Sequence, residues 1–468
     1  MPGNILLLQG PMGPFFKRLS RDLESLGDST VYKINFNAGD WLFYRGANVV
    51  NFRGTQEQWP DFLAEKIDEW QIDTIYLFGD TRSYHQLARE VASRFSVKVS
   101  VFEEGYLRPH YVTLEEGGVN KRSSLSRDPD FYHNLTVPQE PHPKPVATSH
   151  SYCCTAWYAV CYYAFSWLGR YRFSHYAHHR PFNPLDEAFL WVRAGFRKYY
   201  YRRQQRGILG KLTTTHSGKY YLSPLQVHCD GQIKACEGVA SAAFFIRRTI
   251  RSFVRNAPSE TLLVLKHHPL CRGYSDYTRL IQKLTRLYGC ENRVIYVHDL
   301  HLPTMLKHAL GTIVVNSTAG LSSLWHNTPV ITLGRTVYDM HGLTFQGKLD
   351  DFWQAPGKVD QDLYRKFRSH LLKTNQINGN FYKTHASKTS QTGMDVRRLA
   401  IGNSAYSIQK DSVTEAPAVW ANISWHQAES GPLNANDAAA PSHQSSYADG
   451  QAAAAEAPGD MLAKQMQG

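Results

Sequence analysis

The regular alternation of short apolar runs with amphipathic segments is the feature that most constrains this fold. Apolar runs that end at residues 9, 36, 78 and 102 are separated by segments with helical spacing at 15–26, 57–70 and 84–95. Strands that alternate with helices predict βαβ units and a parallel, Rossmann-like sheet. The same alternation returns between residues 220 and 333. The sequence therefore predicts an α/β protein with two Rossmann-like units.

Length and composition agree with several domains. A chain of 468 residues is too long for one hydrophobic core. We expect a first Rossmann-like domain over residues 1–135, a basic, aromatic, mainly helical insertion over 136–215, a second Rossmann-like domain over 216–386 and a low-complexity, poorly ordered tail over 387–468. The net charge of +12 indicates an anionic partner. Seven cysteines without a CxxC pair, and an amino terminus unlike a secretory signal, favour a cytoplasmic setting.

The expected insertion combines aromatic residues with positive charge. Its segment 152–168 has seventeen uncharged residues rich in Tyr and Trp, and residues 170–211 hold ten Lys or Arg against two acids. Helical spacing over 186–206 indicates an amphipathic helix that docks on an anionic membrane surface. A basic helix packed on its own domain, or one that contacts RNA, is the alternative. A full membrane span is disfavoured because the uncharged segment is short and rich in Tyr and Trp.

Two acidic residues and an arginine follow the strand predicted to end at residue 102. In open α/β sheets, ligands bind at the carboxyl ends of the strands, so Glu103, Glu104, Gly105 and Arg108 are candidate site residues. Strand alternation directs the two carboxylates to opposite faces, and we favour Glu104 as the functional one. The alternative is a solvated loop that carries ordinary charges.

The second unit also places polar residues where predicted strands end. They predict an anion site, in which Lys266 and His268 supply charge and the helix that starts after residues 316–318 supplies N–H groups. Ser317 or Thr318 could instead act only as a helix cap. A carboxylate in this unit could face one from the first unit, and glycosyl chemistry uses such pairs, one as nucleophile and the other as acid or base. The candidates are Asp230, Lys266, His268, Asn316, Ser317 and Thr318.

Several short motifs give the chain a family resemblance. It resembles the capsule polysaccharide biosynthesis family of Gram-negative bacteria, and within it the β-Kdo transferases that start the lipid-linked linker of group-2-type capsules. The matching stretches extend over about residues 4–385. They are residues 8–16, 35–41, 78–80, 102–109, 114–120, 224–227, 268–269, 316–320 and 342–347.

The resemblance implies a GT-B architecture, two Rossmann-like domains around a cleft. It implies a retaining transferase that moves Kdo from CMP-Kdo to a phosphatidylglycerol-type lipid. His268 would bind the CMP phosphate with Ser317 and Thr318, Asp230 would attack the anomeric carbon, and Glu104 or Glu103 would be the acid/base.

The implied setting is peripheral, on the cytoplasmic face of the inner membrane. The partners would be an anionic phospholipid and other capsule synthesis and export proteins, with no nucleic acid. No metal motif is present in the sequence, and we expect neither a metal nor a cofactor beyond the donor substrate. A GT-B enzyme for another nucleotide sugar and a non-catalytic capsule assembly or export component remain alternatives.

Overall fold

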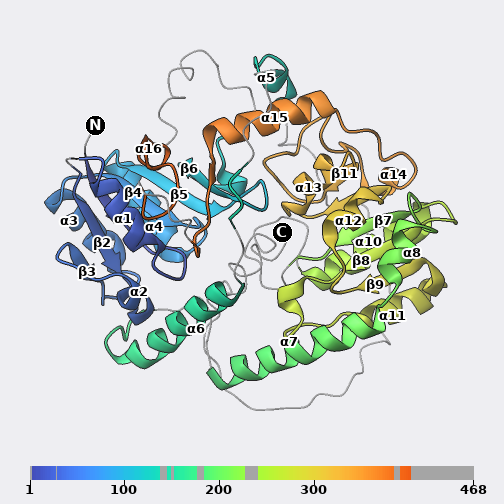
Figure 1. The fold of residues 1–468 in the computed structure, drawn as a ribbon, viewed down its shortest axis with the longest axis horizontal. Helices are drawn as coiled ribbons and strands as arrows, with labels where there is room; N and C mark the ends of the chain where they lie inside the picture. Colours follow the sequence, from blue (N-terminus) through green and yellow to red (C-terminus); the bar gives the residue numbers. More distant parts are fainter. Residues whose placement is uncertain are drawn as a thin grey trace. The chain divides into compact units, whose positions relative to one another are not determined.

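The computed structural model describes residues 3–27, 29–137, 145–148, 152–176, 184–226, 241–383 and 390–401. Within these ranges the chain forms two α/β units, each built on its own sheet (Figure 1). Asp230 and the part of the predicted tail beyond residue 401 lie outside the described residues.

The first sheet has seven strands in the order β12-β6-β5-β4-β1-β2-β3. Strands β1 to β5 are parallel, whereas β6 pairs antiparallel with both β5 and β12. The strands are β1 (Asn4–Leu7), β2 (Val31–Asn35), β3 (Val49–Asn51), β4 (Ile72–Phe78), β5 (Lys98–Glu104), β6 (Tyr111–Glu116) and β12 (Gln376–Asn378).

Helices cover both faces of this sheet because strands buried on both sides need an apolar layer on each. Leu19 and Leu399 share one core with β1 and β5, and Leu63 and Val91 share the other. The helical segments of this unit are α1 (Phe15–Glu24), α2 (Ala38–Phe43), α3 (Trp59–Glu69), α4 (Ser83–Arg94), η1 (Asn120–Arg122) and α16 (Val396–Ile401). Helix α5 (Pro129–His133) instead packs against α15 (Gln361–Thr374) in the core of the second sheet.

The second sheet is fully parallel, in the order β11-β10-β7-β8-β9. Its strands are β7 (Tyr220–Pro224), β8 (Leu262–Lys266), β9 (Val294–Val297), β10 (Gly311–Val314) and β11 (Val330–Thr332). Its helical segments are α8 (Ile208–Thr213), α10 (Ala242–Asn256), η3 (Pro269–Cys271), α11 (Thr278–Tyr288), η4 (Glu291–Arg293), α12 (Leu302–Lys307), α13 (Ala319–Trp325), α14 (Leu349–Phe352) and α15 (Gln361–Thr374).

Both sheets share one strand order, and this confirms the predicted α/β class with two Rossmann-like units. In each, the first strand lies beside the second on one side and the fourth on the other, which creates a switch point where ligands bind in such folds. One expectation was wrong, because the first sheet is mixed rather than parallel. Only residues 105–110 separate β5 from β6, too few for the crossover that a parallel pair needs.

The aromatic insertion forms two long helices, α6 (Tyr152–Leu168) and α7 (Pro184–Gln204), with η2 (Gly169–Tyr171) after the first. Tyr162 of α6 lies beside α2, where it accepts a hydrogen bond from Asn37 Nδ2 at 2.7 Å and donates to Asp40 Oδ1 at 3.2 Å. None of the described helices is both long and apolar enough to cross a bilayer.

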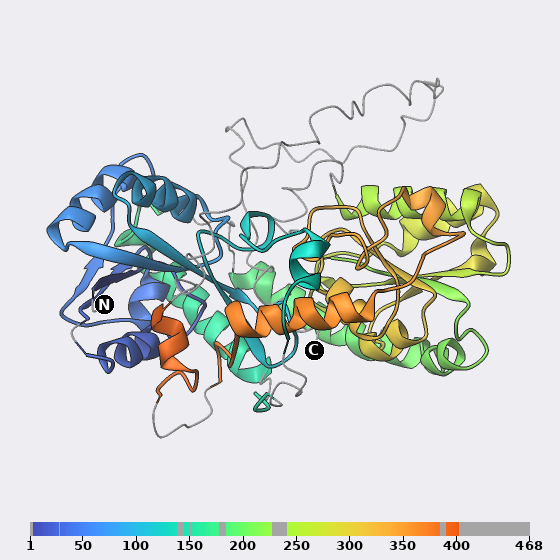
Figure 2. The same cartoon turned by 90° about the horizontal axis from the view of Figure 1, so that it is seen from above.

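After α15 the chain returns to the first sheet through β12 and α16 (Figure 2). Asp22 of α1 is buried and accepts hydrogen bonds from Ser390 Oγ and from the backbone N–H of Thr392, both at 2.8 Å. The expectation of a poorly ordered tail from residue 387 is therefore wrong for residues 390–401, which the buried carboxylate of Asp22 holds in place.

Candidate active site

The two glutamates after residue 102 belong to the sheet and are buried. β5 extends through Glu103 and Glu104, which pair with Thr113 and Val112 of β6, and each is only 7% exposed. Glu103 Oε1 accepts the backbone N–H of Glu104 at 3.0 Å. Burial to this degree excludes the solvated-loop alternative, because carboxylates are rarely buried without a partner or a use.

A half-buried arginine supplies positive charge to this pair. Arg108 lies near Glu104 and Glu103, whose negative charges oppose the lowering of its guanidinium pKa by burial. Its Nε has no hydrogen-bond partner among the described residues. Two carboxylates and one guanidinium thus share a site with little access to water.

The loop between β5 and β6 is compact because it contains a glycine at the right place. A Cβ on Gly105 would collide with the carbonyl oxygen of Tyr111, so the two backbones can approach only without a side chain there. The sequence predicted Gly105 as a substrate contact, and the structure gives it this packing role.

Asn120 connects Glu103 to a third buried carboxylate, that of Glu115, which the sequence interpretation missed. Its Nδ2 donates to Glu103 Oε2 at 3.4 Å, and its backbone N–H donates to the Tyr106 hydroxyl at 2.7 Å. Tyr106 contacts Glu115, and burial raises the pKa of Glu115 to about 7 despite hydrogen bonds from Ser123 and Tyr106. Glu115 lies in the matching stretch 114–120, but strand alternation alone does not distinguish it from a surface glutamate.

At the carboxyl edge of the second sheet, Lys266 is the last residue of β8, and His268 lies two residues after it. Lys266 is buried, and desolvation lowers its pKa to about 8, although Asp299 opposes the shift. His268 Nδ1 accepts the backbone N–H of Leu270 at 3.3 Å, so the neutral ring carries its proton on Nε2. The end of β8 therefore carries a lysine with a lowered pKa and an imidazole N–H group.

The loop after β10 is held by its own contacts. Ser317 Oγ accepts the backbone N–H of Ala319 at 3.2 Å, and Tyr338 donates to the Ser317 carbonyl. Ser317 therefore closes a local turn before the helix and does not occupy the N-cap position of α13. Thr318 is the residue before α13 and makes no side-chain cap hydrogen bond.

Gln226 is a further residue of this edge that the sequence interpretation did not single out. Its Nε2 donates to Asn316 Oδ1 at 2.6 Å, and its Oε1 accepts the Asn316 N–H at 3.4 Å. This amide pair joins the ends of β7 and β10, which are the two strands at the switch point.

The structure thus collects the predicted residues in two groups, one for each sheet. Glu103, Glu104 and Arg108 lie at the end of β5, whereas Lys266, His268 and the 316–318 loop lie at the ends of β8 and β10. Among the described residues, no set of three His, Cys, Asp or Glu side chains could hold a metal ion.

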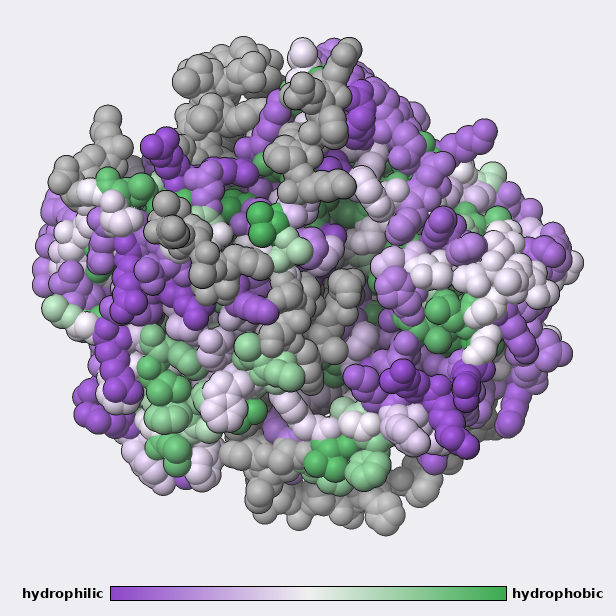
Figure 3. Space-filling model, in the orientation of Figure 1, coloured by the Kyte–Doolittle hydropathy of each residue, from purple (hydrophilic) through white to green (hydrophobic). Residues whose placement is uncertain are grey.

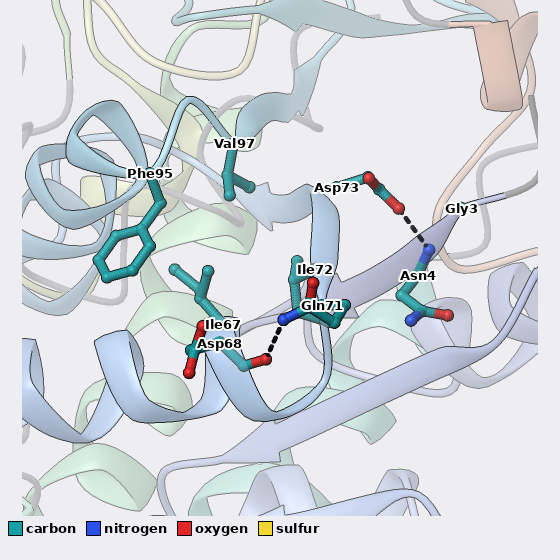
Figure 4. A pocket seen from close by; sticks show the side chains of 9 residues that line it. All are labelled: Gly3, Asn4, Ile67, Asp68, Gln71, Ile72, Asp73, Phe95 and Val97. Carbon is teal, nitrogen blue, oxygen red and sulfur yellow. Dashed lines mark hydrogen bonds between the residues drawn. The ribbon is translucent and has the colours of Figure 1, made fainter.

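A separate pocket lies at the opposite edge of the first sheet (Figure 4). It is lined by residues at the beginning of β1 and β4, including Asn4, Gln71 and Asp73, and holds none of the predicted site residues. Because ligands of Rossmann-like sheets bind at the carboxyl edge, this pocket is not part of the candidate site.

Two Rossmann-like units, each with polar residues at the carboxyl edge of its sheet, give the chain a GT-B-like fold. A family model described as "Capsule polysaccharide biosynthesis protein" matches residues 73–382. The chain belongs to this capsule polysaccharide biosynthesis family.

Individual relatives agree with this assignment. The capsule polysaccharide export protein KpsS of Escherichia coli is 43% identical over 377 residues, which is 81% of this chain and 96% of KpsS. The capsule polysaccharide modification protein LipB of Neisseria meningitidis serogroup B is 39% identical over 384 residues, 81% of this chain and 91% of LipB.

Among solved structures, the β-Kdo 2,7-transferase of KpsC from Thermosulfurimonas dismutans matches 77% of this chain and 88% of its own, with 14% identity and a TM-score of 0.36. A similarity at this level identifies no reaction.

Proposed function

We propose that this chain is a retaining β-Kdo glycosyltransferase of capsule polysaccharide biosynthesis. It would transfer Kdo from CMP-Kdo, without a further cofactor, to an anionic lipid of the phosphatidylglycerol type. The observation that carries the proposal is the buried pair Glu103 and Glu104 beside Arg108 at the end of β5. A protein that only binds or recruits has no need to bury two adjacent carboxylates at a ligand edge.

Each group then has a role that its chemistry suits. Lys266 and His268 would bind the phosphate of CMP and stabilise its charge as it leaves. Asp230 would form the bond to the anomeric carbon, and Glu104 or Glu103 would transfer the proton of the acceptor hydroxyl. Arg108, Gly105 and Asn316, with Ser317 and Thr318, would shape the substrate contacts.

A second candidate function is a non-catalytic role in capsule assembly or export. The name of the KpsS relative, an export protein, favours it. Under this alternative the two edges would still bind nucleotide or lipid, but the carboxylates at the end of β5 would be dispensable. Either function would place the chain among other capsule synthesis and export proteins.

The deciding experiment is incubation of the purified protein with CMP-Kdo and short-chain phosphatidylglycerol. We expect release of CMP and a Kdo-lipid, measured by mass spectrometry. Glu104→Gln should lower the rate by about 100-fold or more, as expected for loss of an acid/base group. Glu103→Gln is the matched variant, and the larger loss identifies the proton-transfer residue.

Three outcomes separate the two candidate functions. Absence of both CMP release and Kdo-lipid with folded wild-type protein contradicts the transferase. Turnover that persists at the wild-type rate in both glutamine variants contradicts the assignment of the carboxylates. Retained capsule export in cells that carry the double variant supports the non-catalytic role.

We also propose that α6 and α7 dock the enzyme on the cytoplasmic face of the inner membrane. Both helices expose large apolar side chains, among them Trp157 and Leu168 of α6 and Phe189, Phe196 and Tyr199 of α7. Hydrophobic side chains gather over both helices in the space-filling view (Figure 3). Interfacial aromatics flanked by basic residues are typical of helices that lie in the headgroup region.

A further inference from the structure

Helix α7 has an inner face as well as the exposed aromatic face. Phe196 and Tyr199 are 75% and 72% exposed, whereas Arg193 and Arg197 are half-buried and Tyr201 is buried. The inner face is formed by Leu190, Arg193, Ala194, Arg197, Tyr201 and, just beyond the helix, Gln205. Its arginines point into the protein, unlike the basic residues expected on a helix that only binds lipid.

The two inner arginines hold the backbone of residues 272–276, which we call the donor-edge loop. Arg193 Nε donates to the carbonyl of Gly273 at 2.7 Å. Arg197 Nη1 donates to the carbonyl of Arg272 at 2.8 Å, and its Nη2 lies 3.5 Å from Asp276 Oδ2. Hydrogen bonds from a guanidinium are among the stronger ones, because the donor is charged.

A glycine allows the helix and the loop to touch. A Cβ on Gly273 would collide with the carbonyl oxygen of Leu190, so their backbones are in direct contact. Tyr201 adds a hydrogen bond from its hydroxyl to Asp276 Oδ2 at 3.1 Å. The contact is therefore specific in shape as well as in charge.

The donor-edge loop continues directly from the proposed phosphate site. It follows His268 through the short η3 turn, whose Leu270 N–H donates to His268 Nδ1. The side chain of Arg272 pairs with Asp299, and the negative charge of Asp299 acts on Lys266. Displacement of this loop would thus alter both groups that we assign to the CMP phosphate.

The end of α7 also holds the neighbouring strand end. Gln205 Oε1 accepts the backbone N–H of His298 at 2.9 Å, and Gln205 Nε2 lies 3.0 Å from His298 Nδ1. The ring of His298 stacks on Tyr201, with centroids 3.4 Å apart. His298 precedes Asp299, so α7 supports both loops that surround Lys266.

We infer that the inner face of α7 positions the donor-edge loop, which makes Arg193 and Arg197 positioning residues for nucleotide binding. The inference rests on the proposed function, because it assigns CMP to the ends of β8 and β10. It also gives α7 a role distinct from lipid binding, since the two faces of the helix carry different residues.

The test compares Arg197→Gln with Arg286→Gln, a matched change at an exposed arginine of α11. Calorimetry with CMP should show roughly tenfold weaker binding for Arg197→Gln, the order expected for a lost charge-assisted hydrogen bond, and no change for Arg286→Gln. Arg197→Lys should recover part of the affinity. Hydrogen exchange of the amides at 270–276 should accelerate only in the Arg197 variants.

The KM values for the two substrates distinguish a positioning role at the nucleotide site from a general structural role. Arg197→Gln should raise the KM for CMP-Kdo and leave the KM for the lipid unchanged. Unchanged CMP affinity in Arg197→Gln, or equal losses in both glutamine variants, overturns the inference. If the wild-type protein binds no CMP, the proposed donor is wrong. In that case hydrogen exchange decides, and unchanged exchange at 270–276 in Arg197→Gln overturns the positioning role as well.

Discussion

At the scale of single residues, Lys266 is a buried cation of the candidate site whose pKa is shifted toward neutral pH. Burial lowers its pKa to about 8, so near neutral pH it is mostly protonated, and it becomes neutral as pH rises further. A bound phosphate would favour the charged form and raise this pKa, because opposite charges stabilise each other. Nucleotide binding and protonation of Lys266 are then linked.

We therefore predict that CMP affinity falls as pH rises above about 8, by at most about tenfold per pH unit. Binding near pH 8 should also take up protons, which calorimetry in buffers of different ionisation enthalpy measures. Lys266→Met should bind CMP more weakly at neutral pH and should show no further decline in affinity above pH 8. His268→Ala should also weaken CMP binding, but the decline in affinity above pH 8 should remain. A wild-type affinity that is constant to about pH 9.5 would count against Lys266 as a phosphate ligand.

Sequence reasoning about single residues predicted the position of four candidate residues at strand ends, and the structure confirms these positions. Glu103, Glu104, Lys266 and His268 were predicted because each follows an apolar run. Glu115 was missed, because its pKa depends on the burial of one position within a strand, which alternation alone does not reveal. Arg272 was missed for a similar reason, since its partner Asp299 is distant in sequence.

At the scale of elements, α7 combines features of two alternatives from the sequence analysis, packing on its own domain and exposure of an aromatic face for membrane docking. It packs on its own domain through Arg193 and Arg197, and it exposes Phe189, Phe196 and Tyr199. The pattern predicted the helix but not which arginines turn inward, because that depends on carbonyl oxygens of the donor-edge loop. Antiparallel β6 and the short β12 also had no clear pattern of their own.

The outer face of α7 should bind vesicles that contain anionic lipid and fail to bind neutral ones, with binding weakened by salt. Replacing Phe196 and Tyr199 by Ser should reduce vesicle binding in flotation assays by about tenfold or more, because each removes an exposed aromatic anchor. Trp325→Ser, which removes another exposed aromatic residue elsewhere, is the control. Equal binding to neutral and anionic vesicles would contradict the electrostatic part of the proposal.

At the scale of the whole molecule, the alternation of strands and helices predicted two sheets, but not how the chain returns to the first. Residues 376–401 add β12 and α16 to the first unit, although residues 220–333 built the second. Contacts over such separations depend on partners like Asp22, which meets Ser390 and Thr392 across more than three hundred positions. Local spacing in a sequence carries no record of them.

This return predicts unequal effects of two truncations. A chain that ends at residue 389 loses the hydrogen bonds of Ser390 and Thr392 to Asp22 and the packing of Met394 and Leu399 in the core, and it should be less stable than one that ends at 403 by about 3 kcal/mol. Urea denaturation followed by fluorescence measures the difference. Asp22→Asn in the full chain should reproduce part of the loss. Equal unfolding midpoints for the two truncations would show that residues 390–401 contribute little.

The position of β12 also affects how the protein is made. Ribosomes release the strands of the first sheet early, yet its edge strand β12 emerges only after the entire second unit has been synthesised. Until then β6 has an unpaired edge, which can pair with other chains. The second unit does not depend on a later strand, because β7 to β11 follow one another in the sequence with no strand of the first sheet between them. During translation the later unit can therefore complete its sheet before the earlier one does.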